Sequence, residues 1–466
     1  MLKKIIQAAL GAIGLSVIGS CALAQQFPVY ELGKAKYGCS AAADINNYNN
    51  SYLGSFKTLV LGKEDWLFRT GTDMLGSFGP DDASLVLLKK LVSSLKAKGI
   101  QLMVVYVPTR GLLHNRFFDD VNARAYNHEQ ALNNYRQALE RIRAQGIVVA
   151  DYSQLITQPL SDDYYFKRDH HWTPFGAKVT ARVAADYLRS QQVTEGFAPQ
   201  TFVNRPEGVF GRDGTLQLAW KSLCDQQFLK QFVPFYVHER GESSVANAED
   251  ALFSDESVPE ISLVGTSFSA DLKFNFVGFL REYLGTDITN LSIEGGGFDG
   301  SLLQTLNDPE FLANPPKLLI WELPAYYRLD EREFYRQAMP LINSSCEGKT
   351  PVLSETVKLK PGKNEFLFNA GGADSERVDN IDNKNHFMEL QFSDTNFRKL
   401  DMVIWHLNGR RDTVKIERSD TVEMNGRFVF DLKDENKWAD FIYLSSEINI
   451  PENYTDLSVN VRLCKR

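Results

Sequence analysis

The chain has 466 residues, of which 43% are hydrophobic and 12% aromatic, so it can form the cores of two or three globular domains. Its formal net charge is −8, and loss of Lys3 and Lys4 with an N-terminal leader would bring the charge to −10. Because phosphate backbones require a basic surface, this charge argues against a nucleic-acid partner, and any acidic polymer would have to meet a local basic groove.

The N-terminus has the features of a cleaved signal peptide. Two lysines precede the mostly apolar residues 5–19, and Ala22-Leu23-Ala24 places small residues at the positions that signal peptidase reads. The apolar run is too short for a stable membrane anchor, which needs about 20 apolar residues. We expect cleavage after residue 24, although residues 18–21 loosely resemble a lipoprotein box, in which Cys21 would carry a lipid. No later segment is predicted to be transmembrane, so the mature protein is expected to be soluble.

Cysteine usage also favours export. Four cysteines lie outside the signal peptide, and an even number in an oxidising compartment indicates two disulfides. Their spacing permits one bridge in each half of the chain, so we expect Cys39–Cys224 and Cys346–Cys464; four buried free thiols are the alternative. No Cys-x-x-Cys or His-rich spacing indicates a structural zinc site.

Residues 30–335 alternate between helical and strand patterns. Leucines at helical spacing predict a helix over 82–98, and further helices are expected over 128–145 and 174–189. Apolar runs predict strands over 102–107, 147–150, 261–264, 288–293 and 317–323. Such alternation predicts an α/β fold with a parallel sheet covered by helices on both faces. Residues 206–259 do not fit it and are expected to form an insertion or an irregular cap.

The pattern changes near residues 343–351 to short alternating strands. Asn408-Gly409 and Asn425-Gly426 adjoin such strands, and Asn-Gly between alternating runs is a strong signal for a hairpin. A β-sandwich is therefore expected at the C-terminus. The predicted division of the chain is a signal peptide over 1–24, an α/β domain over 25–342 and the β-sandwich over 343–466.

Gly265-Thr266-Ser267 is the first element that carries chemistry. It follows the apolar strand at 261–264, so Ser267 is expected at the carboxyl end of a parallel strand, where open α/β sheets place their sites. The glycine allows a sharp turn, and a helix beginning near Ser269 would direct backbone N–H groups at an oxyanion. A Gly-x-Ser tripeptide also occurs in many ordinary serine turns.

Asp169-His170-His171-Trp172 is the second element. Asp169 can accept a hydrogen bond from Nδ1 of His171, which would orient the ring and leave Nε2 facing a serine. Adjacent histidines beside an aspartate are unusual in a chain with only seven histidines. A metal pair or surface histidines that cap the next helix are the alternatives, although a metal needs at least three ligands and no further cluster stands out. From these residues alone, the alternatives stay open.

Taken together, these motifs resemble a known family. Asp-x-His upstream of Gly-Thr-Ser-x-Ser is similar to the alginate O-acetyltransferases of the AlgX/AlgJ family, whose domains are SGNH-hydrolase-like with the Asp–His element before the serine. Residues 62–68, 106–110 and 321–326 carry further similar motifs. The extra β-domain, the four cysteines and the cleavable signal resemble the AlgX branch, because AlgJ is membrane-anchored and lacks that domain. The resemblance covers nearly the whole mature chain.

The resemblance implies roles for the three residues. Ser267 would be the nucleophile, His171 the general base and Asp169 its orienting partner. Ser267 would take an acetyl group and pass it to a sugar hydroxyl deprotonated by His171.

Further site residues are expected at the same rim. Tyr326 and Arg110 lie at predicted strand ends and are candidates for substrate binding or oxyanion support, with a packed tyrosine and a surface ion pair as the alternatives. The oxyanion Asn block of ordinary SGNH enzymes is not recognisable, and the backbone of Gly295-Gly296-Gly297 could replace it.

The C-terminal domain resembles the carbohydrate-binding module of the same family. Along residues 401–406, Trp405 lies on the face opposite to the expected core residues, so it is expected to be exposed near Arg410 and Arg411. An aromatic ring stacks on sugar faces and a guanidinium binds a uronate carboxylate. A two-residue turn would put Arg410 on the Trp405 face, and a longer loop or a bulge would put Arg411 there. Asp401 shares that face and fits an anionic polymer poorly; a buried Trp405 is the alternative.

These inferences predict a periplasmic O-acetyltransferase of alginate biosynthesis, an exopolysaccharide pathway, with mannuronate 2- and 3-hydroxyls as implied acceptors. No metal or cofactor is predicted. The expected partners are the anionic polysaccharide, membrane proteins that supply the acetyl donor and other periplasmic export proteins; the chain is expected to be a monomer. An acetylesterase with the same centre and a non-catalytic polymer-binding scaffold are the alternatives. The sequence identifies neither the donor nor the role of His170.

Overall fold

The computed structural model describes residues 37–241, 259–343, 346–369, 378–433 and 438–466. The predicted signal peptide and Cys21 therefore lie outside the described residues. Within the described ranges, no helix is both long enough and apolar enough to span a membrane.

A parallel sheet of four strands forms the centre of the first domain. The strands are β3 (Gln101–Val107), β6 (Ile261–Val264), β7 (Ile288–Asn290) and β8 (Leu318–Pro324), and they are hydrogen-bonded in the order β3-β8-β6-β7. Every pairing among them is parallel. Their side chains are almost all buried because helices cover both faces of the sheet, as the alternating pattern predicted.

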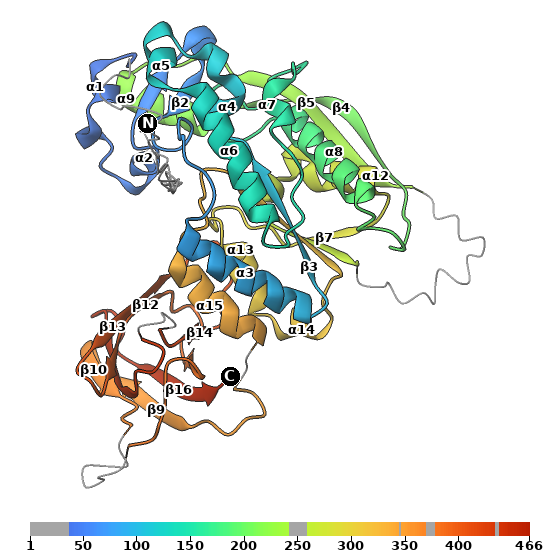
Figure 1. The fold of residues 1–466 in the computed structure, drawn as a ribbon. Coiled ribbons are helices and arrows are strands. Elements are labelled where there is room, and N and C mark those ends of the chain that lie inside the picture. The colour runs from blue at the N-terminus through green and yellow to red at the C-terminus, as the bar shows by residue number, and fades with distance from the viewer. Residues whose placement is uncertain (1–36, 242–258, 344–345, 370–377, 434–437) are drawn as a thin grey trace, which may run out of the picture.

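The long helices lie in two layers on either side of this sheet (Figure 1). Helices α3, α13 and α15 form one layer, and α6, α8 and α12 form the other. The helices and helical turns of this domain are α1 (Ser40–Ala43), η2 (Ile45–Asn47), α2 (Ser51–Gly54), η3 (Lys63–Asp65), α3 (Asp82–Ala97), α4 (Arg110–His114), η4 (Asn115–Phe117), α5 (Asp120–Ala125), α6 (His128–Arg143), α7 (Gln154–Thr157), α8 (Pro174–Ser190), α9 (Thr215–Cys224), α11 (Ser267–Ala270), η5 (Leu272–Phe274), α12 (Phe276–Leu284), α13 (Gly300–Leu306), α14 (Pro309–Ala313) and α15 (Arg332–Asn343).

Two predicted strands are shorter than expected. Residues 147–150 join the sheet only through an isolated parallel bridge between Val148 and Met103 of β3. Strand β7 ends at Asn290, and the backbone after it turns toward the Gly295–Gly297 loop, where Gly295 and Gly297 have positive φ.

The stretch from residue 206 to residue 259 was expected to be an insertion or an irregular cap, and the part that the structure describes is regular rather than irregular. Strands β4 (Phe202–Arg212) and β5 (Gln231–Arg240) form an antiparallel ribbon, and α9 connects them. The register shifts between Pro206 and Val209, so the proline sits at an irregularity where no ladder hydrogen bond is required. The ribbon lies beside α8 and α12 in Figure 1. A further antiparallel pair is formed by β1 (Leu59–Leu61) and β2 (Leu67–Arg69).

The C-terminal part is a sandwich of two antiparallel four-stranded sheets, as predicted. One sheet has the order β10-β15-β12-β13 and the other β14-β11-β16-β9. Burial alternates along β12, so Leu400, Met402 and Ile404 face the second sheet. The strands are β9 (Leu353–Leu359), β10 (Gly362–Phe366), β11 (His386–Phe392), β12 (Lys399–His406), β13 (Arg411–Glu417), β14 (Arg427–Asp431), β15 (Tyr443–Ile450) and β16 (Leu457–Lys465).

Both expected disulfides are present. Cys39 at the start of α1 is bonded to Cys224, the last residue of α9, and Cys346 is bonded to Cys464 in β16. The predicted boundary between residues 342 and 343 falls in the last turn of α15 and stays a prediction. In Figure 1, α15 lies against the sandwich, which is coloured orange to red.

Candidate active site

The strand β6 delivers Ser267 to the carboxyl end of the parallel sheet, as predicted. Strand β6 ends at Val264, and a Cβ at Gly265 would lie 2.7 Å from a carboxylate oxygen of Glu322, so only glycine fits there. The hydroxyl of Thr266 caps the short helix α11 by accepting a hydrogen bond from the Phe268 N–H at 3.2 Å. Ser267 is the first residue of α11, and its side chain remains partly exposed.

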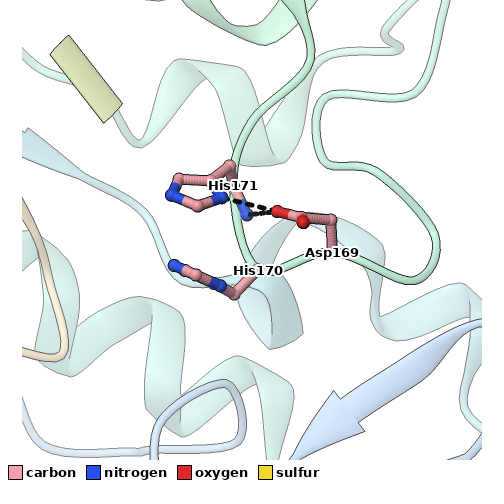
Figure 2. Close-up of side chains that lie close together, drawn as sticks. All are labelled: Asp169, His170 and His171. Atoms are coloured by element: carbon pink, nitrogen blue, oxygen red, sulfur yellow. Dashed lines mark hydrogen bonds and ion pairs between the residues drawn. The ribbon is translucent and has the colours of Figure 1, made fainter. Parts of the chain in front are cut away.

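Ser267, His171 and Asp169 form one continuous series of contacts. Ser267 Oγ lies 2.8 Å from His171 Nε2, and His171 Nδ1 lies 2.5 Å from Asp169 Oδ1. Figure 2 shows the second contact and the additional hydrogen bond from the His171 backbone N–H to Asp169. Asp169 and His171 are only 1% and 3% exposed. In the neutral tautomer whose Nδ1 proton is directed at Asp169, Nε2 carries a lone pair that can accept the proton of the serine.

Both oxygens of the Asp169 carboxylate accept hydrogen bonds. Its second oxygen accepts hydrogen bonds from Arg212 Nε at 2.9 Å and from the backbone N–H of Thr215 at 3.0 Å. Thr215 is the first residue of α9, so the carboxylate also lies at a helix N-terminus, which favours negative charge. Burial alone would raise the pKa of Asp169, but His171, His170 and Arg212 hold it well below its usual value.

His170 lies directly against the ring of His171. The centroids of the two imidazoles are 3.7 Å apart (Figure 2). His170 Nδ1 lies 2.7 Å from the hydroxyl of Thr215. Burial, followed by the neighbouring charge on His171, holds the pKa of His170 well below its usual value. His170 is therefore neutral at neutral pH.

Ligand atoms of Asp169, His170 and His171 lie within 4.8 Å of one another, a spacing that a metal ion could use. However, both oxygens of Asp169 already accept hydrogen bonds, and Arg212 places a fixed positive charge beside them. A cation would have to displace these donors and lie beside the guanidinium. The arrangement therefore favours acyl transfer over metal binding.

Glu322 supports the turn that carries Ser267, from the neighbouring strand β8. One carboxylate oxygen accepts hydrogen bonds from the Thr266 N–H and from the Ser269 hydroxyl, both at 3.0 Å. The side chain is completely buried, and burial raises the pKa of Glu322 to about 7 even though these hydrogen bonds lower it. The contacts fix the backbone on both sides of Ser267.

Tyr326 follows β8, which is hydrogen-bonded to β6, so it lies at the same end of the sheet as Ser267. Its ring is stacked under the guanidinium of Arg69, with 5.1 Å between the charged carbon and the ring centroid. The ring is partly exposed, and burial raises the pKa of its hydroxyl. Tyr326 thus keeps the position that the sequence predicted, and its role stays a prediction.

Arg110 does not lie on an open rim. It is 1% exposed and lies between the rings of Trp66 and Tyr165, at 5.4 and 5.2 Å, and its Nη1 donates to the Phe166 carbonyl at 2.5 Å. The expected surface position is wrong because the chain turns Arg110 inward at the start of α4. This position does not support direct binding of a polymer.

The carbohydrate-binding surface predicted around Trp405 lies on the outer face of the sheet that contains β12. Trp405 is partly exposed and its indole N–H donates to Glu447 at 3.4 Å. Trp405 pairs with Arg411, whose guanidinium carbon lies 6.0 Å from the ring centroid. Of the two alternatives, the structure has the longer loop: it is one residue longer than a two-residue turn, so Arg411 lies on the Trp405 face and Arg410 directly precedes β13.

Three contributors to the site were not predicted: Arg212, Thr215 and Glu322. Glu322 stands within a run of apolar residues, and a charged residue in a buried strand is a signal that could have found it. Arg212 and Thr215 belong to the segment for which an insertion or an irregular cap was expected, and no sequence signal placed that segment beside Asp169.

The fold and the contacts define a class of protein: an SGNH hydrolase-like α/β domain with a Ser–His–Asp contact series, followed by a β-sandwich. Residues 59–325 match the family model for the SGNH hydrolase-like domain of the acetyltransferase AlgX. Residues 345–466 match a C-terminal carbohydrate-binding module.

Individual relatives agree with this class. The alginate biosynthesis protein AlgX of Pseudomonas aeruginosa is 39% identical over 441 residues, which is 94% of this chain and 90% of AlgX. The solved structure of P. aeruginosa AlgX has a TM-score of 0.81 and covers 92% of this chain and 99% of its own. The probable alginate O-acetylase AlgJ of Pseudomonas fluorescens is 30% identical over 65% of this chain and 75% of AlgJ. The chain belongs to the AlgX family, which confirms the resemblance seen in the sequence.

Proposed function

We propose that this protein is a periplasmic O-acetyltransferase that moves acetyl groups through Ser267 onto mannuronate hydroxyls of alginate. The observation that carries the proposal is the contact series from Ser267 Oγ through His171 to Asp169 at the carboxyl end of the parallel sheet. The names of the relatives, an alginate biosynthesis protein and a probable alginate O-acetylase, support the choice of polymer and reaction.

In the first half-reaction, Ser267 Oγ attacks the carbonyl carbon of the acetyl donor. His171 Nε2 takes the hydroxyl proton, and the resulting imidazolium is stabilised by the Asp169 carboxylate 2.5 Å from Nδ1. The bond from the acetyl carbon to the donor then breaks, and His171 returns the proton to the leaving group. An acetyl ester on Ser267 remains.

In the second half-reaction, a mannuronate hydroxyl attacks the acetyl ester. His171 Nε2 takes the sugar proton, the bond from the acetyl carbon to Ser267 Oγ breaks, and the proton passes to the serine oxygen. The loop that carries Gly295–Gly297 is a proposed source of oxyanion donors, because the Ile293 N–H just before it donates to the Gly265 carbonyl at 3.2 Å.

The outer face around Trp405 is proposed to hold the polymer. The ring offers an apolar surface to a sugar, and Arg411 offers a cation to a uronate carboxylate. Asp401 on the same face lies 3.9 Å from Lys415, which offsets its negative charge. The two disulfides support folding in an oxidising compartment, and the acetyl donor is proposed to come from membrane partners.

The test is mass spectrometry of oligomannuronate incubated with the protein and a chromogenic acetyl ester. We expect wild type to add acetyl groups to the sugar and Ser267→Ala to add none, because the mutant lacks the attacking oxygen. Ser93→Ala, which changes an exposed serine on α3, is the matched control and should keep full activity.

Two results would contradict the proposal. Ester cleavage that depends on Ser267 without acetylation of the sugar would identify an esterase or a different acceptor. Acetylation of the sugar by Ser267→Ala at the wild-type rate would rule out Ser267 as the nucleophile.

A further inference from the structure

The side chain of Arg212 contacts residues of the proposed triad, and these contacts are not needed to hold the β4–β5 ribbon together. It is the last residue of β4, and its backbone pairs with Gln231 of β5. Its side chain leaves the ribbon and reaches the loop of Asp169, and it is 19% exposed. The guanidinium carbon lies 5.0 Å from the ring centroid of Phe274, so an aromatic face supports it.

The guanidinium makes three polar contacts with different groups. Nε donates to Asp169 Oδ2 at 2.9 Å, Nη1 donates to Asp271 Oδ2 at 3.0 Å, and Nη2 lies 3.3 Å from His171 Nδ1. Since Nδ1 directs its own proton at Asp169, the last contact adds positive charge beside the ring rather than a strong hydrogen bond.

These contacts join the two segments that form the centre. Asp169 belongs to the loop that carries His171, whereas Asp271 directly follows α11, and its backbone N–H donates to the carbonyl of Ser267 at 3.2 Å. The fork of a guanidinium can bind two carboxylates at fixed angles, which an ammonium group cannot do. Arg212 therefore fixes the distance between the acid and the nucleophile helix.

We propose that Arg212 is a positioning residue of the acyl-transfer centre, which holds the Asp169 carboxylate under His171 and ties both to the helix of Ser267. This inference rests on the proposed function. Arg212 takes no part in bond making, and it acts through Asp169 and His171.

Charged and titratable groups face the ring of His171 and determine how its protonation depends on Arg212. Asp169 and Arg212 contact Nδ1, the neutral His170 packs against the ring at a tilt of 37°, and Asp271 contacts the far side of the guanidinium. Replacing Arg212 by a neutral residue removes a cation beside the protonated ring and beside Asp169. Both changes favour proton uptake, so the acidic limb of kcat/KM should move to higher pH.

The experiment compares Arg212→Met and Arg212→Lys with Arg205→Met, in the full chain. Arg205 lies on the same strand in an exposed ion pair with Glu239, so it is a matched control away from the site. With a chromogenic acetyl ester, we expect Arg212→Met to lower kcat about 10- to 100-fold, a typical cost of removing a group that orients a reacting residue. The kcat of Arg212→Lys should lie between those of Arg212→Met and wild type. Its acidic limb should shift less than that of Arg212→Met, because the charge is kept.

A second measurement does not depend on turnover. The proton between His171 Nδ1 and Asp169 should give a downfield proton NMR signal that Asp169→Asn abolishes. We expect Arg212→Met to shift or broaden this signal and Arg205→Met to leave it unchanged. If wild type lacks turnover that depends on Ser267, the proposed function fails, while the NMR comparison still decides the role of Arg212.

The proposal is overturned if both Arg212 variants keep the wild-type kcat, acidic limb and NMR signal. An equal loss of kcat in Arg212→Met and Arg205→Met, with the acidic limb unmoved, would also overturn it, because this would indicate only a structural effect of the ribbon. Should Arg212→Met fail to fold, Arg212→Lys decides through its pH profile and its NMR signal.

Discussion

At the scale of single residues, the pKa values of two buried carboxyl groups of the site are shifted in opposite directions. Asp169 is held well below its usual pKa because His171, His170 and Arg212 outweigh the effect of burial. Glu322 receives hydrogen bonds only from neutral N–H and O–H groups, and burial raises its pKa to about 7. The difference comes from the charge of the neighbours, because both side chains are almost completely buried.

Replacing Asp169 by asparagine should lower kcat for ester cleavage by roughly 10⁴-fold. The amide keeps the shape of the side chain but no longer stabilises the imidazolium or selects the tautomer with a proton on Nδ1. Steady-state kinetics with a chromogenic acetyl ester measures the effect. Asp162→Asn is the control, because Asp162 is exposed in the same loop. A loss of less than tenfold in Asp169→Asn would contradict the orienting role.

Glu322 predicts a dependence of stability on pH. Between pH 4.5 and about 7 the folded protein keeps the Glu322 proton, whereas the unfolded chain has lost it, so the free energy of unfolding decreases as pH rises through this range. For a shift of this size the decrease is about 3 kcal/mol. Glu322→Gln cannot ionise and should lack this contribution.

Urea denaturation of wild type and Glu322→Gln at pH 4.5 and pH 7.5 measures the difference. The free energy of unfolding of wild type should fall by about 3 kcal/mol more than that of the mutant. Comparing the two proteins cancels the contributions of the other carboxyl groups. Equal pH dependence in both would contradict the raised pKa.

At the scale of helices and strands, local signals predicted the long helices well. The sequence placed helices at 82–98, 128–145 and 174–189, and the structure has Asp82–Ala97, His128–Arg143 and Pro174–Ser190. Each begins at a side chain that caps the first turn, namely Asp81, Asn127 and Thr173. Helical periodicity and caps lie within the helix itself, so a single sequence contains them.

The ribbon of β4 and β5 lacked such signals. Pro206, Gly208 and Gly211 interrupt β4, and proline and glycine normally argue against a strand. The ribbon is stable because its inner side chains pack on other helices, and this support comes from residues far away in the sequence. The contact of Arg212 with Asp169 was not predicted because it too joins residues that are far apart in the sequence. The contact between Asp169 and His171 was predicted because the Asp-x-His spacing is local.

The two Asn-Gly pairs had different outcomes. Asn408-Gly409 joins β12 to β13 as a hairpin, as predicted. Asn425-Gly426 precedes β14, which pairs with β11 in the other sheet, so the hairpin expected there is absent. A turn motif specifies the local bend but not which strand pairs with the next one.

The register of β12 and β13 leads to a prediction for polymer binding. Arg411→Ala should weaken binding to oligomannuronate about fivefold, because one cation beside Trp405 is worth roughly 1 kcal/mol at a partly exposed site. Arg410→Ala is the matched control, because Arg410 precedes β13 and is not the residue that pairs with Trp405. Isothermal titration calorimetry measures both. A larger loss in Arg410→Ala than in Arg411→Ala would contradict the assignment of this face.

At the scale of the whole molecule, the two domains share an interface with buried charges. Arg336 on α15 makes an ion pair with Asp412 of β13 at 2.8 Å and donates from Nε to the Asp431 carbonyl at 2.7 Å. Arg427 of β14 donates to the side chain of Asn307, just after α13, at 2.9 Å. Because α13 and α15 pack on the parallel sheet, the sandwich is attached to the domain that carries Ser267.

This interface predicts how the protein unfolds. Arg336→Met removes one of the two cations paired with the nearly buried Asp412 and leaves Lys433, at 3.1 Å, as the other, so it should cost about 2 kcal/mol. We expect a single calorimetric transition in wild type, and in the variant an earlier transition of the sandwich, because the coupling between the domains is weakened. Arg141→Met, which breaks an exposed pair with Asp82, is the control and should change stability by less than about 1 kcal/mol. An unchanged single transition in Arg336→Met would show that apolar packing of α15, rather than this ion pair, couples the two domains.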